Sequence, residues 1–207
     1  MTDNFHRIQR LLTFESMDDF YHLQIIKRKK ENPDLGSNNH VIKTYYIRMN
    51  EDGTNTLDKY KDEIMNLCKW NNARAYINLN VRSFEKANLM MIKALADNVL
   101  NKNFRAARNA FDTVAGRMKG SRDKTWVIDI DWDDLEFSGE GLQEEINEIS
   151  NVIWNLQKET GRHPMVEEIP TRNGLHLITR PFNLQRFSEL YPKIDVHKNN
   201  PTILYIY

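Results

Sequence analysis

The sequence contains a single cysteine, Cys68, and no apolar run that approaches the length needed to span a membrane. One cysteine excludes a disulfide within the chain and any cysteine-rich zinc site. The first thirty residues also lack the basic and apolar regions of a secretory signal peptide. These absences predict a soluble protein of a reducing, cytoplasmic compartment, with no membrane partner.

A net charge is missing too, because 29 Lys and Arg residues balance 29 Asp and Glu residues. This balance argues against a wholly basic nucleic-acid coat protein, but the charges are unevenly distributed. Residues 101–124 carry seven basic residues against two acidic ones, and residues 129–168 carry twelve acidic residues against two basic ones. The seven basic residues are Lys102, Arg105, Arg108, Arg117, Lys119, Arg122 and Lys124. A basic segment followed by an acidic one suits a site that holds metal and phosphate, and it also suits two unrelated solvated faces.

No internal repeat, low-complexity tract or interdomain linker interrupts the sequence. The length predicts one compact domain over 1–207, with an N-terminal α/β lobe (1–120) and a motif-bearing sheet lobe (121–207). Strands are expected over 20–30, 41–49, 73–82, 124–131, 164–171, 175–180 and 202–207, and helices over 56–70, 141–161 and 183–191, with a long helical stretch from Ser83 that breaks near 101–103. The fold class is therefore α+β (mixed α/β). Asn173-Gly174 between two extended runs adds an antiparallel hairpin.

The stretch TWVIDIDWDD at 125–134 places acid after acid at the end of a strand. Successive side chains of a strand alternate between faces, so Asp129 and Asp131 lie on one face, while Ile128, Ile130 and Trp132 lie on the other. Two neighbouring carboxylates repel each other unless a positive group lies between them, and a divalent metal would supply it. An edge strand with one wet face would give the same pattern.

Two further strand segments carry polar residues of the same kind. His176 follows the Asn-Gly turn, and the nearby Arg172 makes an anion site plausible there, although a single strand histidine is often structural. In the last segment, Asp195 and His197 alternate with apolar residues, which also fits a polar edge strand.

In chain order, these pieces are an apolar run with Asp129-x-Asp131, then Gly174-x-His176 on a strand, then an apolar residue before Asp195. In this order the sequence resembles the catalytic core of the archaeo-eukaryotic primase superfamily, which includes the primase-polymerases. The resemblance implies an RRM-like sheet with packed helices, preceded by a small α/β lobe. It also implies a template-directed DNA or RNA nucleotidyltransferase.

The implied chemistry requires Mg²⁺ or Mn²⁺, and the ligands implied by the resemblance are Asp129, Asp131 and Asp195. The residues expected at the phosphates of a nucleoside triphosphate are Gly174 and His176 by resemblance, with Arg172 and Lys198 added as nearby positive groups. The basic residues of 102–124 could follow the backbone of a single-stranded DNA or RNA template. A helicase or another replication protein is the expected protein partner.

Other functions fit part of the pattern. Asp-x-Asp also marks nucleotide-sugar glycosyltransferases, although Gly174-x-His176 has no assigned role in them. A non-catalytic nucleic-acid-binding accessory protein could carry the same acids as a wet strand face. Haloacid-dehalogenase-like phosphatases share the opening Asp-x-Asp, but Trp132 and Asp133 stand where that family needs a Thr or Val, so this class is discounted.

Overall fold

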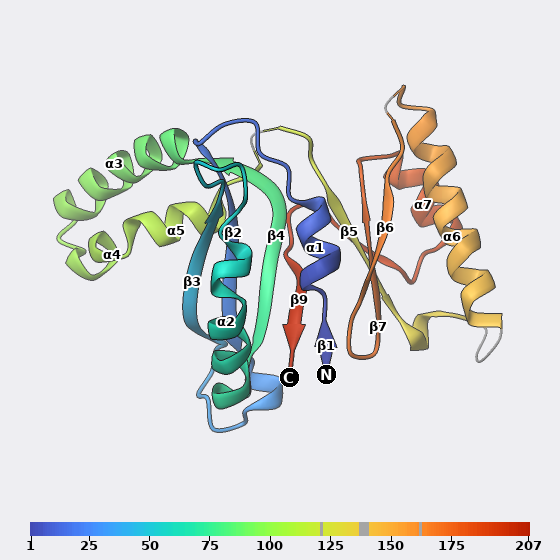
Figure 1. Cartoon of the computed structure of the whole chain (residues 1–207), viewed down its shortest axis with the longest axis horizontal. Coiled ribbons are helices and arrows are strands. Elements are labelled where there is room, and N and C mark those ends of the chain that lie inside the picture. Colours follow the sequence, from blue (N-terminus) through green and yellow to red (C-terminus); the bar gives the residue numbers. More distant parts are fainter. Residues whose placement is uncertain (121, 137–140, 162) are drawn as a thin grey trace.

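Two antiparallel sheets lie side by side in the computed structural model of the chain, which describes residues 1–120, 122–136, 141–161 and 163–207 (Figure 1). The first sheet has the strand order β1-β9-β4-β2-β3, and the second has the order β6-β7-β5-β8. The first sheet consists of β1 (Thr2–Asp3), β2 (Asp19–Lys27), β3 (His40–Arg48), β4 (Arg74–Ser83) and β9 (Thr202–Ile206). The second consists of β5 (Trp126–Asp131), β6 (Val166–Pro170), β7 (Gly174–Thr179) and β8 (Asp195–His197). Together with the helices, these sheets confirm the α+β class.

Helices α1 and α2 cover the first sheet, α6 and α7 cover the second, and α3 to α5 form an arm that projects from the first sheet (Figure 1). Their bounds are α1 (Phe5–Leu11), α2 (Leu57–Asn71), α3 (Phe84–Leu100), α4 (Phe104–Arg108), α5 (Ala110–Arg117), α6 (Gly141–Lys158) and α7 (Leu184–Leu190). Two short 3-10 turns, η1 (Lys29–Glu31) and η2 (Trp132–Asp134), follow β2 and β5. None of the described helices is long and apolar enough to cross a membrane.

The second sheet has the RRM-like topology expected from the resemblance. Its elements follow the order β5-α6-β6-β7-α7-β8, and the hydrogen-bonded order of the strands places β5 between β7 and β8. This is the β-α-β-β-α-β arrangement in which a helix connects each outer strand to an inner one. It makes β5, which carries two of the candidate acids, an inner strand.

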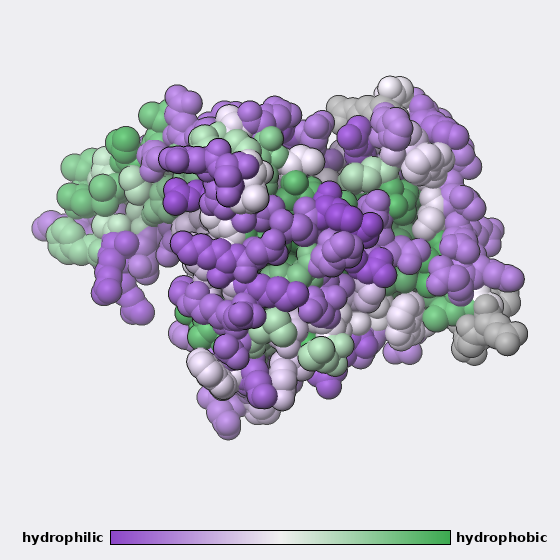
Figure 2. Space-filling model, in the orientation of Figure 1, coloured by the Kyte–Doolittle hydropathy of each residue, from purple (hydrophilic) through white to green (hydrophobic). Residues whose placement is uncertain are grey.

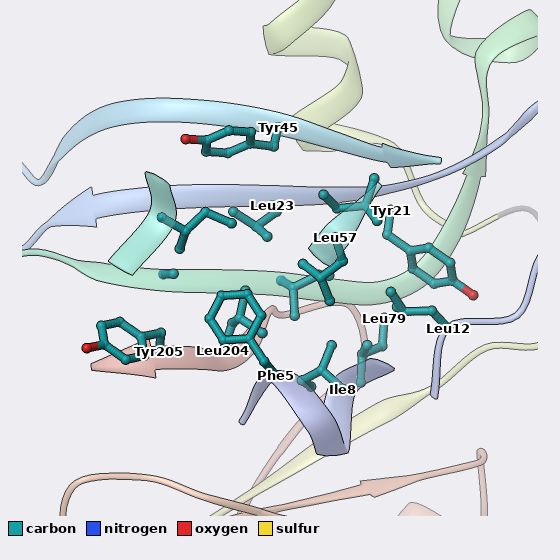
Figure 3. Packing of buried hydrophobic residues seen from close by; sticks show 14 of the residues in the cluster. Phe5, Ile8, Leu12, Tyr21, Leu23, Tyr45, Leu57, Leu79, Leu204 and Tyr205 are labelled. Carbon is teal, nitrogen blue, oxygen red and sulfur yellow. The ribbon is translucent and has the colours of Figure 1, made fainter. Parts of the chain in front are cut away.

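The first core lies between the first sheet and helices α1 and α2. Leu23 and Ile25 alternate along β2 and are fully buried, as are Ile8 of α1 and Leu57 of α2. Figure 3 shows Leu23, Ile8 and Leu57 converging in one layer with Phe5. Burial of each such side chain contributes about 1.5–3 kcal/mol. This packing holds the first sheet against α1 and α2.

The second core, between helix α6 and the second sheet, covers one face of β5 and leaves the other face for functional side chains. Helix α6 presents one apolar stripe to the sheet, formed by Ile146, Ile149, Ile153 and Leu156. Ile128 and Ile130 of β5 are fully buried in this core. Because strand side chains alternate, Asp129 and Asp131 must point to the opposite face, toward the first sheet. Trp132 is 40% exposed and begins η2, so it does not share the buried face on which alternation places it with Ile128 and Ile130.

The last strand crosses from one lobe to the other. The expected boundary assigns 202–207 to the second lobe, whereas β9 pairs with β4 and β1 in the first sheet. All five residues of β9 are buried, because its apolar side chains occur at successive positions and both faces of the strand must be covered. As a result, Thr202 lies against the second sheet, where it contacts His176.

The projecting arm exposes several large apolar side chains along α3 and at the start of α4. Helix α3 begins at the Ser83 cap, whose side chain accepts a hydrogen bond from the Lys86 amide, and the break expected near 101–103 separates α3 from α4. Ala87 is the one residue of α3 that is fully enclosed, and Leu100 is 81% exposed. Figure 2 shows the apolar colour concentrated over this arm.

Candidate functional site

The register of β5 places three polar residues in one row. Asp129 is paired with His176 of β7 on one side and with Asp195 of β8 on the other. Directly opposed residues of neighbouring strands share a face, with Cβ atoms about 4.5–5.5 Å apart. The sheet therefore brings Asp195 beside Asp129, as expected from the sequence, although nothing local in the chain connects them.

His176 is held between the two sheets. Its Nε2 lies 3.3 Å from Oδ1 of Asp129, and its Nδ1 lies 2.8 Å from the hydroxyl oxygen of Thr202 on β9. Thr202 is fully buried, and His176 is nearly so. The hydrogen bond from His176 holds the pKa of Asp129 below its ordinary value, even though partial burial acts in the opposite direction. The imidazole is thus fixed in orientation and directs an N–H at the carboxylate.

Asp131 has the opposite electrostatic environment. Desolvation raises its pKa above the ordinary value, and the carboxylates of Asp129, Asp134 and Asp133 raise it further. Its side chain also caps η2, while the Asp134 carboxylate accepts a hydrogen bond from the Asp131 amide at 3.2 Å. Part of the acid run is therefore structural, because Asp134 closes the turn after the strand.

Gly174 allows the close approach of β7 to β5. A Cβ at this position would lie 1.9 Å from the carbonyl oxygen of Ile130 and 2.9 Å from the Cα of Asp131. Gly174 is itself buried, so the structure gives it a packing role in place of the expected contact with nucleotide. The small residue of the Gly-x-His motif thereby positions His176 and Asp131 relative to each other.

A cleft of about 580 Å³ opens in front of Asp129, Asp131 and His176. Both sheets contribute to its wall. The residues from the second sheet and its loops include Asp129, Asp131, Arg172, Asn173, His176 and His197, and those from the first sheet and its loops include Arg28, Lys30, Glu31, Arg74, Tyr76 and Asn200. Acids and histidines thus share one cleft with four cationic side chains.

The cationic wall is only partly neutralised. Glu31 accepts a hydrogen bond from Nε of Arg74 at 3.1 Å, makes a second contact with its Nη2, and lies 3.8 Å from Arg28. Burial lowers the pKa of Arg74, and the positive charges of Arg28 and Arg172 lower it further. Three guanidinium groups near one carboxylate leave an excess of positive charge, which a polyanion would neutralise.

Sequence reasoning missed Arg28, Lys30 and Arg74, which belong to the first sheet and its loops. The signal that could have found the first two is the basic run at 27–30, which starts at the last residue of β2. Arg74 opens β4 and carries no local signal. Of the cations that were expected at the nucleotide, Arg172 lines this cleft.

Lys198 lies elsewhere, because it follows His197 and points away from the cleft that His197 lines. Its ammonium group is 5.2 Å from the centre of the Trp126 ring, and it lines a second cleft with Lys119 and Lys124. The structure therefore separates Lys198 from Arg172 and His176, with which it was expected to act.

The seven basic residues of 102–124 do not act as one group. Arg122 forms a two-pronged ion pair with Asp19, at 3.0 and 2.8 Å, and lies 3.1 Å from Glu15, so it links the loop before β5 to the first lobe. Burial alone would raise the pKa of Asp19, but the bonds from Arg122 and from two backbone amides lower it below its ordinary value. The expectation that Arg122 binds template is therefore replaced by a structural role. The others divide into Lys102, Arg105 and Arg108 near the end of the arm, and Arg117, Lys119 and Lys124 near β5.

The donor set fits a hard divalent cation, because carboxylate oxygens of Asp129 and Asp131 share one face of β5. Asp195 adjoins them by register, but it is exposed on an edge strand and lies outside the set of described residues that line the cleft. Within 1–120, 122–136, 141–161 and 163–207, no three His, Cys, Asp or Glu side chains are gathered closely enough to hold a metal ion. The backbone therefore aligns the three acids, while their side chains do not converge on one point.

The chain matches no family model, and neither the search of curated proteins nor the search of solved structures found a protein similar to it.

Proposed function

We propose that the chain is a metal-dependent nucleotidyltransferase of the primase-polymerase type, which adds nucleotides to a primer on a single-stranded template. The observation that carries this proposal is the shared cleft, where the row of Asp129 and His176 faces the arginines of the first sheet. An acid row alone would fit a wet strand face. Acids opposite a cationic wall that Glu31 neutralises only in part fit a substrate that carries several phosphates together with a metal.

The cationic wall would bind the triphosphate. Arg74 is held in place by Glu31, and Arg28 and Arg172 are close enough to influence its pKa. Planar guanidinium groups pair with phosphate oxygens through two parallel hydrogen bonds, which fixes the orientation of a phosphate chain. Lys30 adds a positive charge close enough to Asp131 to offset part of the rise in its pKa, so Lys30 lies near the acids of the cleft.

The acids would hold the cation. Asp129 and Asp131 would supply ligands from the cleft, and Asp195 would join them from the edge strand. Magnesium or manganese bound there would supply neutralisation of the triphosphate and activation of a primer 3′-hydroxyl. In the chain itself, His176 fixes the carboxylate of Asp129 by donating a hydrogen bond to it, and Thr202 fixes His176 in turn.

Thermal unfolding in Mn²⁺, with and without a deoxynucleoside triphosphate, tests this proposal. A ligand at 100 times its Kd stabilises the folded chain by about 2.7 kcal/mol, which corresponds to a rise in Tm of roughly 5–10 °C for a chain of this size. We expect the nucleotide to raise the Tm more in the presence of Mn²⁺ than in its absence. Asp131→Asn should remove this dependence on metal, and Arg172→Gln should reduce the shift caused by the nucleotide.

Asp133→Asn is the matched control, because Asp133 is an exposed acid two positions from Asp131 and is not among the described residues of the cleft wall. It should respond to metal and nucleotide as the wild type does. A larger shift with a UDP-sugar than with any triphosphate would contradict the proposal and favour a glycosyltransferase. The absence of any shift with metal and nucleotides would favour a non-catalytic nucleic-acid-binding protein.

A further inference from the structure

A second cleft, of about 540 Å³, lies next to the first and has no role in the function proposed so far. Its wall combines three lysines with two aromatic rings. These residues are Lys119, Lys124, Trp126, Phe182 and Lys198. They come from the loop before β5, from β5 itself, and from the segments after β7 and β8.

The two clefts share one wall, the loop 198–201 between β8 and β9. Lys198 and Asn199 line the second cleft, while Asn200 and Pro201 line the first. The loop is anchored, because the carbonyl oxygen of Asn199 accepts a hydrogen bond of 2.7 Å from the side chain of Asn78, which is buried on β4. An extended polymer that occupies both clefts would therefore need to cross only this short, anchored loop.

The lysines of this cleft are available to an anion. None of the three has a carboxylate partner among the described residues, in contrast to Arg122 of the same segment, which Asp19 and Glu15 engage. Trp126 packs edge-on against Phe182 with ring centres 5.3 Å apart, and the Lys198 ammonium lies over the Trp126 ring. Trp126 remains partly exposed. Lysines and a partly exposed aromatic ring are two components with which proteins bind single strands: the lysines bind phosphates, and the ring stacks on a base.

We infer that the second cleft binds single-stranded nucleic acid and holds the unpaired template next to the nucleotide cleft. The description of the strand as a template rests on the proposed function, whereas binding of a single strand does not. Lys119, Lys124 and Lys198 contact the phosphates, and a base stacks on Trp126. Lys198 thus acts on the template and not on the triphosphate.

Fluorescence anisotropy with a labelled fifteen-nucleotide oligothymidylate, measured in EDTA with the full chain, tests this inference. In EDTA no metal-dependent reaction can occur, so binding is measured alone. The cleft variant replaces Lys119, Lys124 and Lys198 by glutamine. The matched control replaces Lys102, Arg105 and Arg108 by glutamine, which removes the same charge from the arm.

We expect the cleft variant to bind about 10-fold or more weakly and to lower the slope of log K against log salt by about 2, since each lost phosphate contact on a single strand contributes about 0.7. The arm variant should change the affinity by less than about 2-fold. Trp126→Leu keeps an apolar side chain against Phe182 but removes the stacking surface, so it should weaken binding by about 5-fold or more with an unchanged salt slope.

Equal losses in the cleft and arm variants, no effect of Trp126→Leu, or no binding by the wild type would each overturn the inference. Primer extension in Mn²⁺, measured separately, distinguishes this failure from failure of the proposed function. Cleft-dependent binding without extension leaves the single-strand site intact and contradicts the enzyme. Extension by the wild type, with cleft variants that bind the oligonucleotide normally, contradicts this inference alone.

Discussion

Replacing Gly174 by alanine should disrupt the contact between β7 and β5 on which the candidate site depends. The added Cβ would lie 1.9 Å from the Ile130 oxygen and 2.9 Å from the Asp131 Cα. Close carbon–oxygen contacts are normally about 3.3 Å or longer, so the strands would have to separate by more than about 1 Å. Both obstructing atoms belong to backbone, and no side-chain rotation can move them away.

Overpacking in a well-packed region costs about 1–3 kcal/mol or more, and separation of the strands also weakens the pairing of Gly174 with Asp131. We therefore expect the free energy of unfolding, measured in urea, to fall by about 3 kcal/mol and the Tm to fall by roughly 6–12 °C.

Gly116→Ala is the matched control, because its Cβ would meet the His22 ring at an ordinary 3.8 Å, within helix α5. Alanine favours a helix over glycine by about 1 kcal/mol, so this variant should be as stable as the wild type or slightly more so. If Gly174→Ala unfolds within about 1 kcal/mol of the wild type, the strand contact is not as tight as described and the reasoning fails.

Three further changes test the electrostatics of the site and its support. The lowered pKa of Asp129 stabilises the fold above pH 3.8, and this contribution is lost as the pH falls through the lower pKa of the folded state. His176→Ala removes the hydrogen bond that lowers this pKa but leaves the burial that raises it, so carbon-13 NMR should find Asp129 titrating at a higher pH than in the wild type. An unchanged pKa would contradict the pairing of His176 with Asp129. Arg122→Gln leaves the buried Asp19 carboxylate without its guanidinium partner and should cost about 1.5–3 kcal/mol in urea unfolding, whereas a loss below about 0.5 kcal/mol would show that the ion pair contributes little. Asp131→Asn removes a charge that the folded state disfavours and keeps a side chain that can cap η2. At neutral pH, the Tm of this variant should therefore equal or exceed that of the wild type. A lower Tm would mean that the Asp131 carboxylate stabilises the fold.

Local patterns predicted most of the elements. The apolar spacing over 56–70 corresponds to α2, Ser83 caps α3, and the Asn-Gly turn joins β6 to β7. Alternation also placed Asp129 and Asp131 on one face, because that inference needs only the period of a strand. These features depend on neighbours in sequence, which is why the sequence alone defines them.

The contacts between the two sheets could not be predicted in this way. Arg74 joins the cleft only because the first sheet packs beside the second, and β9 joins the first sheet because a strand that is apolar on both faces needs cover on both. The position of Lys198 depends on the direction of its side chain, which lies over Trp126. The role of Arg122 depends on Asp19, a carboxylate far away in the sequence. A count of positive charges in a segment contains neither kind of information.

Primer extension on a single-stranded template in Mn²⁺, with deoxynucleotides and with ribonucleotides, tests the central claim most directly. The wild type should extend the primer, and Asp129→Asn and Asp131→Asn should each reduce the rate by about 100-fold or more, since even the loss of a second-shell partner costs about 10–100-fold. Asp133→Asn should extend at nearly the wild-type rate. Wild-type rates in Asp129→Asn or Asp131→Asn, or no extension by the wild type with either kind of nucleotide, would contradict the assignment of this cleft to nucleotidyl transfer.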